Sequence, residues 1–182
     1  MEVAENYRID ANFRWLGSEI KANEELCLTV CGIERCTPDK FFGPSVREDY
    51  HVHFILHGKG TLEIGGKSYK LQRGQIFVIP PDVETYYYSD PEDPWHYTWV
   101  SFGGTRAGYF LEKAGITAEN PVRDTYIEPE RFLELTEKIL NHHELTVANE
   151  LLRTSLLYEI IALLVESQNQ QKSKEGEEEV YD

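Results

Sequence analysis

Between residues 50 and 102, short runs of β-branched and aromatic residues are separated by Gly, Pro or Asp at intervals of about eight to twelve residues. This rhythm is typical of an all-β sandwich or barrel. Gly65-Gly66 lies between two alternating runs and suits a two-residue hairpin, whose turn needs positive φ. Residues Ile76 to Ile79 have no polar face, which indicates a strand that is covered on both sides. The stretch therefore predicts a mainly β fold.

Length and charge limit the classes of protein that fit this chain. With 182 residues, of which 41% are hydrophobic and 12% aromatic, it can bury the core of one folded domain with a helical appendage. Its net charge of −14 argues against direct DNA binding, because contacts to phosphates need clustered Lys and Arg.

The cysteines and the apolar runs predict a cytoplasmic protein. Cys27, Cys31 and Cys36 are odd in number and include no Cys-x-x-Cys pair, which argues against both a disulfide scaffold and a zinc site. Residues 1–6 are acidic and lack an apolar core, so no signal peptide is expected. The longest apolar run, residues 155–165, is short and contains Glu159, so we expect no membrane span.

Three motifs carry a resemblance to a known family. Two of them, Leu56-His-Gly58-Lys-Gly60 and Arg73-Gly74-Gln-Ile-Phe-Val-Ile-Pro80-Pro81, are similar to segments of the cupin double-stranded β-helix, a jelly-roll barrel. The third, Asp90-Pro-Glu-Asp-Pro94-Trp95-His-Tyr-Thr-Trp99-Val-Ser-Phe102-Gly103, resembles the ligand-binding domain of AraC-family transcription regulators. The resemblance implies a barrel that binds a small-molecule effector, followed by two C-terminal α-helices that dimerise.

The chain divides into four expected parts. They are an N-terminal arm (1–25), the cupin barrel (26–127), a helical dimerisation segment (128–168) and an acidic linker (169–182) with nothing to bury. The arm either folds over the ligand pocket as a lid, as the resemblance implies, or docks on the barrel. In this family a pair of helix-turn-helix units would follow the linker. DNA is therefore expected as a partner only through a domain that this chain lacks.

The last predicted helix, from about Val147 to Ser167, is too apolar for one narrow stripe. Such a helix must be covered on more than one side. One side can face the barrel or the preceding helix, and the other is best explained by a second copy of the chain. The residues expected in this homodimer interface are Leu152, Leu156, Ile160, Leu163 and Leu164.

The strand that begins at Tyr50 raises the question of a metal. By the period-two rule, His51 and His53 share one face. A metallocupin binds its ion with two His and a Glu early in the barrel and a later His, but the matching positions here hold Ser45, Arg47, His51 and Thr85. We therefore expect no cofactor, and we place the two histidines along a cavity. A nonstandard metal site of His51, His53 and Glu63 stays open.

Several residues indicate a carbohydrate site. Sugars present apolar C–H faces and many hydroxyls, so their sites combine aromatic rings with hydrogen-bonding groups. Alternation places Trp95, Tyr97 and Trp99 on one face of a strand, with Trp95 expected in the core. The resemblance implies that Tyr87 and Trp99 match the sugar-contacting Tyr and Trp of arabinose-type members. The resemblance also implies that Arg47 matches the sugar-contacting Arg of those members. Tyr97 stands where they have a sugar-contacting His, and this difference leaves the identity of the sugar or sugar derivative open. The predicted ligand-binding residues are Arg47, His51, His53, Thr85, Tyr87, Tyr97 and Trp99.

Three functions are compatible with these features. The favoured one is a non-enzymatic sensory domain, in which a sugar in the barrel controls an attached DNA-binding domain. The alternative is a stand-alone cupin enzyme, a metal-dependent isomerase or dioxygenase acting on a sugar or small metabolite. Its metal ligands are incomplete. The third is an interaction module that dimerises without any ligand.

Overall fold

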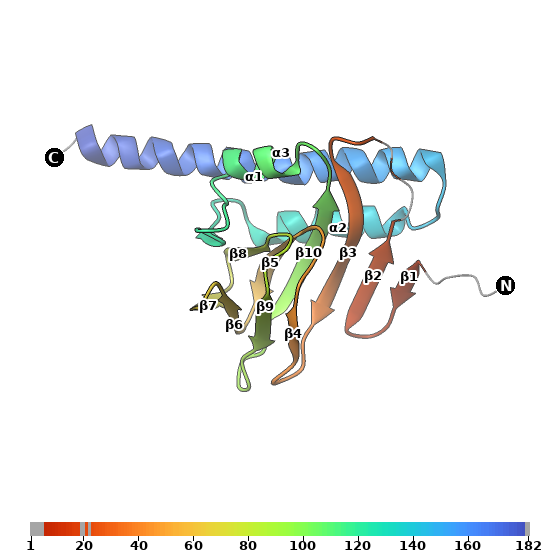
Figure 1. The fold of residues 1–182 in the computed structure, drawn as a ribbon, viewed down its shortest axis with the longest axis horizontal. Coiled ribbons are helices and arrows are strands. Elements are labelled where there is room, and N and C mark those ends of the chain that lie inside the picture. The colour runs from red at the N-terminus through yellow and green to blue at the C-terminus, as the bar shows by residue number, and fades with distance from the viewer. Residues whose placement is uncertain (1–5, 19–20, 22, 181–182) are drawn as a thin grey trace.

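The computed structural model describes residues 6–18, 21 and 23–180 of the chain. This part is mainly β, with strands in two antiparallel sheets and three helices towards the C-terminus (Figure 1). The strands are β1 (Tyr7–Ile9), β2 (Phe13–Gly17), β3 (Cys27–Arg35), β4 (Phe41–Ser45), β5 (Tyr50–His57), β6 (Lys59–Ile64), β7 (Lys67–Gln72), β8 (Gln75–Ile79), β9 (Thr85–Ser89), β10 (His96–Gly103) and β11 (Val122–Asp124). The helices are α1 (Ala107–Lys113), α2 (Pro129–Asn141) and α3 (Val147–Val180).

The strand order gives a larger and a smaller sheet. The seven-stranded sheet runs β1-β2-β3-β10-β5-β8-β11, and the four-stranded sheet runs β4-β9-β6-β7. Because consecutive strands such as β5 and β6 belong to different sheets, the chain passes back and forth between the two layers. The predicted fold class, a cupin-type barrel followed by two C-terminal helices, is confirmed, and α1 is a short helix between barrel and tail.

Local sequence explains how these strands are built. Gly65 and Gly66 connect β6 to β7 with φ values of 58° and 75°, as the hairpin prediction required. The strand β8 pairs with β5 on one side and β11 on the other, and residues 76–79 are all buried. The prediction that this strand is covered on both sides is confirmed.

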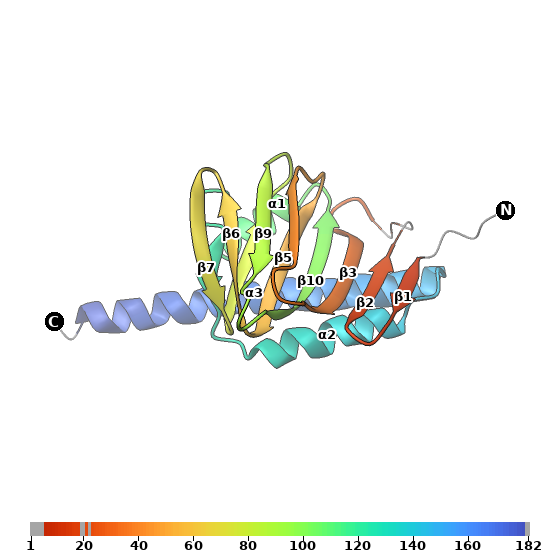
Figure 2. The same cartoon turned by 90° about the horizontal axis from the view of Figure 1, so that it is seen from below.

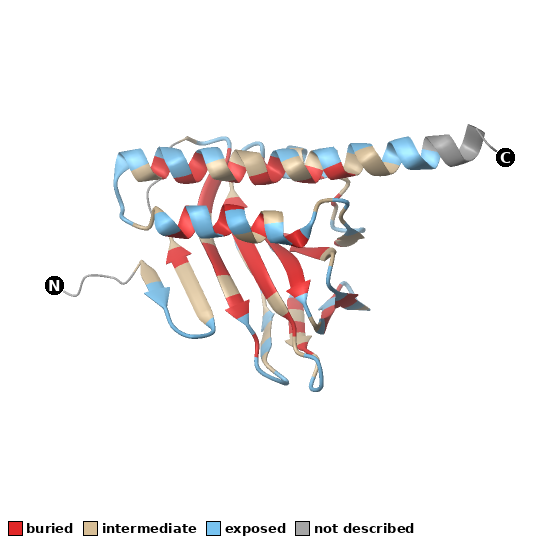
Figure 3. Cartoon of the chain, turned by 180° about the vertical axis from the view of Figure 1, so that it is seen from behind, coloured by how far each residue is buried: buried red, intermediate tan, exposed pale blue. Residues whose placement is uncertain are grey.

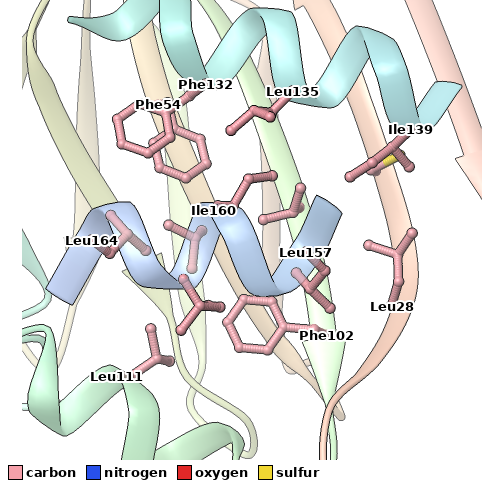
Figure 4. Packing of buried hydrophobic residues seen from close by; sticks show 14 of the residues in the cluster. Leu28, Phe54, Phe102, Leu111, Phe132, Leu135, Ile139, Leu157, Ile160 and Leu164 are labelled. Carbon is pink, nitrogen blue, oxygen red and sulfur yellow. The ribbon is translucent and has the colours of Figure 1, made fainter. Parts of the chain in front are cut away.

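Two hydrophobic cores follow from the alternation of side chains along the strands. In β5, Val52 and Phe54 join the core between the larger sheet and the helices, whereas Ile55 joins the core between the two sheets. Figure 4 shows the first core, where the rings of Phe54 and Phe132 stack with centroids 4.1 Å apart. The second core surrounds the barrel interior and contains Trp95, which is 1% exposed, as the sequence predicted.

The helices α2 and α3 lie next to one another across one face of the larger sheet (Figure 2). Their buried residues form stripes that face the strands, and the opposite sides are exposed (Figure 3). Among the described residues, no helix combines the length and apolarity that crossing a membrane requires.

The helix α3 is longer than the sequence predicted. The prediction ended it near Ser167 and treated residues 169–182 as a linker, but the helix continues to Val180, and residues 181–182 lie outside the described part. The extension is rich in Gln, Lys and Glu, which are good helix formers. Arg123 also anchors its start by hydrogen bonds to the side chains of Gln168 and Gln171.

Residues 7–9 and 13–17 of the predicted arm are strands of the larger sheet. The strands β1 and β2 form a hairpin, and β2 pairs with β3 from Phe13↔Glu34 to Gly17↔Val30. Strand pairing therefore holds the arm against the barrel. Its side chains Phe13 and Trp15 also line the barrel cavity, so the two expected positions of the arm do not exclude one another.

Candidate functional site

The barrel contains a cavity of about 260 Å³ between the two sheets. Six of the seven predicted ligand-binding residues line it: Arg47, His51, His53, Tyr87, Tyr97 and Trp99. The other lining residues are Phe13, Trp15, Val30, Glu34 and Phe42. We call this space the inner chamber.

Strand alternation and register bring these side chains together. His51 and His53 lie on β5, and Tyr97 and Trp99 lie on the neighbouring β10, where Trp99 is paired with His53. Tyr87 comes from β9 of the opposite sheet. Since side chains two residues apart in a strand share a face, each strand contributes its residues to the same side.

Thr85 is the predicted residue that does not line the chamber. It shares the inward face of β9 with Tyr87, as expected, but it is 2% exposed and is paired with Ser45 and Ile64 in the strands on either side. Thr85 lines a surface hollow next to Tyr86 instead. Thr85 is therefore not among the residues that line the chamber.

Aromatic rings form the walls of the chamber. The imidazole of His53 is stacked on Phe77 at 4.4 Å, meets Tyr97 edge-on at 5.0 Å and stacks on Trp99 at 6.2 Å between centroids. Phe13 stacks on Trp99 at 6.0 Å, so the N-terminal hairpin contributes to the same wall. These flat apolar faces suit the C–H face of a sugar ring.

Charged and hydroxyl groups occupy other positions on the wall. Glu34 is 3% exposed, and its Oε2 accepts a hydrogen bond from the Tyr97 hydroxyl at 3.2 Å. Its Oε1 forms an ion pair with Lys40. Arg47 lies close enough to Tyr87 for its charge to act on the phenol. The chamber therefore presents both a carboxylate and a guanidinium to its interior.

The histidines and phenols of the chamber are uncharged at neutral pH. Burial, with the nearby charge of Arg47, lowers the pKa of His51 to about 4, and its Nδ1 lies 2.6 Å from the Ser101 hydroxyl. Burial also lowers the pKa of His53 well below its usual value. Burial raises the pKa of both Tyr87 and Tyr97. Neutral groups of this kind can donate and accept hydrogen bonds without binding a counter-ion.

Two buried nitrogen atoms of the lining residues have no hydrogen-bond partner among the described residues. They are Nε of Arg47 and Nδ1 of His53. Buried polar atoms are nearly always paired in folded proteins, so these two positions favour a polar ligand or water in the chamber.

The described residues contain no group of three or more His, Cys, Asp and Glu placed to hold a metal ion. Glu63, which the alternative metal site required, is exposed on β6 and lines the hollow beside Thr85. It does not line the chamber that contains His51 and His53. The structure therefore does not bring His51, His53 and Glu63 together as a metal site.

Sequence reasoning named no site residue on the first strands, although one of its two positions for the arm lay over the pocket. Phe13, Trp15, Glu34 and Phe42 lie on β2, β3 and β4. The available signal for Glu34 was a carboxylate directly after the largely apolar stretch from Leu26 to Ile33, because a buried carboxylate is costly without a partner.

The residues predicted for a dimer interface fall into two groups. Ile160 and Leu164 are 0% and 2% exposed and belong to the chain's own core, so a second copy cannot reach them. They are buried because α3 packs against α1 and α2 as well as the sheet. Leu152 is 45% exposed, and Leu156 and Leu163 are half-buried, so these three remain available on the surface of α3.

Comparison with known proteins gives a family and several relatives. The family model described as AraC-like ligand binding domain matches residues 28–173. The Msm operon regulatory protein of Streptococcus mutans is 34% identical over 149 residues, which cover 79% of this chain and 52% of that protein. The lactose operon transcription activator of Staphylococcus xylosus is 27% identical over 76% of this chain and 50% of its own length. The raffinose operon transcriptional regulatory protein of Pediococcus pentosaceus is 30% identical over 71% of this chain and 48% of its own length.

The chain spans about half the length of these curated relatives. Solved structures with a similar barrel include a cupin protein from Bacteroides fragilis, with 21% identity and a TM-score of 0.39 over 56% of this chain and 80% of that one. The cupin domain of Cnp3 from Schizosaccharomyces pombe has 12% identity and a TM-score of 0.40 over 63% of this chain and 77% of that one.

Proposed function

The chain belongs to the AraC-like ligand binding domain family, and from this premise we propose that it is the effector-sensing and dimerisation part of a transcription regulator. Its effector is a sugar or sugar derivative that binds in the inner chamber and controls an attached helix-turn-helix domain. The names of the relatives support this proposal, because they are regulators of the Msm, lactose and raffinose operons and are about twice as long as the matched part.

The composition of the inner chamber is the observation that carries the proposal. Aromatic faces from Trp99 and Phe13 line the same chamber as hydrogen-bonding groups of both charge types, Glu34 and Arg47. A carbohydrate needs this combination, because its ring has an apolar face and its edge carries hydroxyls that both donate and accept. The unpaired Nδ1 of His53 adds a position that a ligand hydroxyl can satisfy.

Contacts of the N-terminal hairpin suggest how binding is passed on. Phe13 and Trp15 of β2 line the chamber, while Tyr7 of β1 stacks on His143, with ring centroids 4.1 Å apart. Arg14 donates hydrogen bonds to the Tyr7 hydroxyl at 3.0 Å and to Asn141 at 3.2 Å. The hairpin thus connects the chamber to the turn between α2 and α3. A ligand that shifts Phe13 and Trp15 would bias this turn, which is a coupling between two sites through one movable element.

The exposed part of α3 is the proposed contact to a second copy. Leu152, Leu156 and Leu163 recur at helical spacing and remain partly open to solvent within one chain. Their burial in a dimer would place two α3 helices side by side, each leading toward the segment where a DNA-binding domain would be attached.

Ligand screening tests the proposal directly. Thermal unfolding of the purified chain is measured with a panel of mono- and oligosaccharides, and a bound sugar at a hundredfold excess over Kd adds about 2.7 kcal/mol to the free energy of unfolding. Trp99→Ala should abolish this stabilisation and Arg47→Ala should weaken it. Tyr109→Ala, which removes an exposed aromatic ring on α1, is the matched control and should bind as the wild type does.

Three outcomes contradict the proposal. Without any sugar-dependent shift, the carbohydrate assignment fails. A shift that survives both Trp99→Ala and Arg47→Ala places the site outside the inner chamber. A stoichiometric metal in the purified protein would favour the cupin enzyme instead.

A further inference from the structure

A second compartment adjoins the inner chamber. It has a volume of about 390 Å³ and lies between the β1–β2 turn and the β3–β4 loop, at the end of the strands away from α3 (Figure 1). Three residues line both spaces: Phe13, Glu34 and Phe42. The residues that line the second space but not the first are Arg8, Asp10, Asn12, Arg35, Thr37 and Lys40. We call this second space the vestibule.

The two compartments differ in chemistry. The inner chamber is walled mainly by aromatic rings and neutral imidazoles, whereas the vestibule is walled mainly by charged and amide side chains. Asn12 and Arg35 are both exposed, and the backbone N–H of Arg35 donates to the Asn12 carbonyl at 2.8 Å. That backbone bond fixes the turn next to the loop, so the two side chains are held on neighbouring parts of one wall.

Glu34 lies at the junction between the compartments. Its Oε2 is hydrogen-bonded to Tyr97, which lines the inner chamber, and its Oε1 is paired with Lys40, which lines the vestibule. Lys40 also lies over the ring of Phe42, with Nζ 5.2 Å from the centroid. A buried carboxylate held from both sides in this way can accept hydroxyl hydrogens from either compartment.

The volume of the inner chamber indicates how many sugar rings it can hold. Sites for drug-sized ligands usually have about 300–1,000 Å³, and the inner chamber, at about 260 Å³, lies just below that range. It therefore suits one ring. Taken together with the vestibule on the other side of Glu34, the space enters the usual range, which is the size that a second ring needs.

We propose that the effector is an oligosaccharide whose terminal ring lies in the inner chamber and whose next ring lies in the vestibule. This inference rests on the proposed function, since it concerns the same site. Stacking on Trp99 holds the terminal ring, and Asn12 and Arg35 hydrogen-bond the second. Glu34 lies beside the linkage between them and contacts hydroxyls of both rings.

Calorimetric titration of the full chain tests this assignment with two monosaccharides, galactose and glucose, and two oligosaccharides that contain them, lactose and raffinose. At least one oligosaccharide should bind tenfold or more tightly than either monosaccharide. The double variant Asn12→Ala/Arg35→Gln should lower the affinity for the oligosaccharide about tenfold and leave the affinity for any monosaccharide that binds unchanged. Arg106→Gln, an exposed Arg before α1, is the control and should change neither.

The outcomes separate this inference from the proposal beneath it. Equal affinities for monosaccharides and oligosaccharides, or an oligosaccharide affinity that the double variant leaves unchanged, overturn the vestibule as a second subsite. In either case, loss of binding in Trp99→Ala would show that the inner chamber still binds sugar. If none of the four sugars binds, the oligosaccharide inference fails, and the carbohydrate assignment fails with it if the wider thermal-unfolding panel also gives no shift.

Discussion

Gly32 lies against the indole of Trp99, so that a Cβ at position 32 would fall 2.3 Å from Cη2 of that ring. The same Cβ would fall 2.4 Å from the backbone oxygen of Arg14. Gly32 is paired with Trp99 of β10 on one side and with Trp15 of β2 on the other, and both indoles line the inner chamber. The missing side chain at position 32 therefore leaves the space in which the aromatic wall is formed.

The first prediction is that Gly32→Ala destabilises the chain and disrupts the chamber together. The added methyl meets both the Trp99 ring and the Arg14 backbone, so that the ring must shift within the chamber wall and the backbone of β2 must move. Overpacking of this kind usually costs about 1–3 kcal/mol. Urea unfolding should show that loss, and calorimetry with the best sugar of the screen should show a weaker affinity.

Gly108→Ala is the matched control for this variant. Its Cβ would meet only the hydroxyl end of Tyr50, at 2.9 Å, and Ala is the better helix former in α1. This control should leave the unfolding free energy and the sugar affinity unchanged or raise the former slightly. A Gly32→Ala protein as stable and as active in binding as the wild type would show that Gly32 does not shape the chamber.

The second prediction concerns pH. The pKa of His51 is lowered to about 4 in the folded chain by burial and by Arg47, whereas the unfolded chain has the ordinary value of about 6.5. Between pH 6.5 and pH 4 the imidazole is protonated in the unfolded chain but stays neutral in the folded chain. The free energy of unfolding therefore falls as the pH falls. His51 alone accounts for about 2 kcal/mol between pH 7 and pH 5, and His53, whose pKa is also lowered, acts in the same direction.

Urea unfolding at pH 7 and pH 5 measures this difference. His51→Gln should lose part of the pH dependence, because the amide does not titrate and can still bond Ser101. An unchanged slope in His51→Gln would mean that His51 does not carry the effect.

The faces of the strands could be predicted from the sequence because alternation is a local property. The period-two rule placed His51 and His53 on the face of their strand opposite Val52, and it placed Tyr97 and Trp99 on the same face of theirs. Resemblance supplied Arg47, which alternation alone could not select because it lies outside a strand.

The remaining features depend on contacts between segments far apart in the chain. Glu34 and Phe13 enter the wall because β2 and β10 pair with opposite edges of β3, and no local pattern reports that pairing. The sequence predicted that one side of α3 faces the barrel or the preceding helix and that the other, with Ile160 and Leu164 on it, faces a second copy. Much of the apolar surface of α3 is used within one chain, where Ile160 and Leu164 pack between the sheet and the helices (Figure 4).

The third prediction concerns a buried ion pair at the start of α3. Arg153 Nη2 lies 2.8 Å from Oε2 of Glu150, and the two side chains are 0% and 1% exposed. Arg153 also donates to the backbone oxygens of His142 and Glu144, so it ties the turn between α2 and α3 to the helix. Arg153→Met leaves Glu150 as an uncompensated buried charge and should lower the free energy of unfolding by about 3–5 kcal/mol.

The double variant Glu150→Gln/Arg153→Met separates the charge from the packing. Removing the buried carboxylate should recover a large part of the lost stability, although the turn keeps fewer hydrogen bonds. Both proteins are compared by urea unfolding at pH 7. A double variant no more stable than Arg153→Met would show that the bonds to the turn, and not the unpaired charge, dominate the loss.

The fourth prediction is that Leu152→Glu weakens self-association without unfolding the chain. Leu152 is 45% exposed within one copy, so a charge there costs little in the monomer, whereas in the proposed α3–α3 contact it would be buried without a partner. Sedimentation velocity should show a dimer for the wild type and a dissociation constant at least tenfold higher for the variant. Val46→Glu, at a residue that is 59% exposed after β4, is the control and should sediment as the wild type does. A wild-type monomer would remove the proposed contact between copies, and a Leu152→Glu dimer of unchanged affinity would place that contact on another surface, because Leu152 is the most exposed of the residues expected in it.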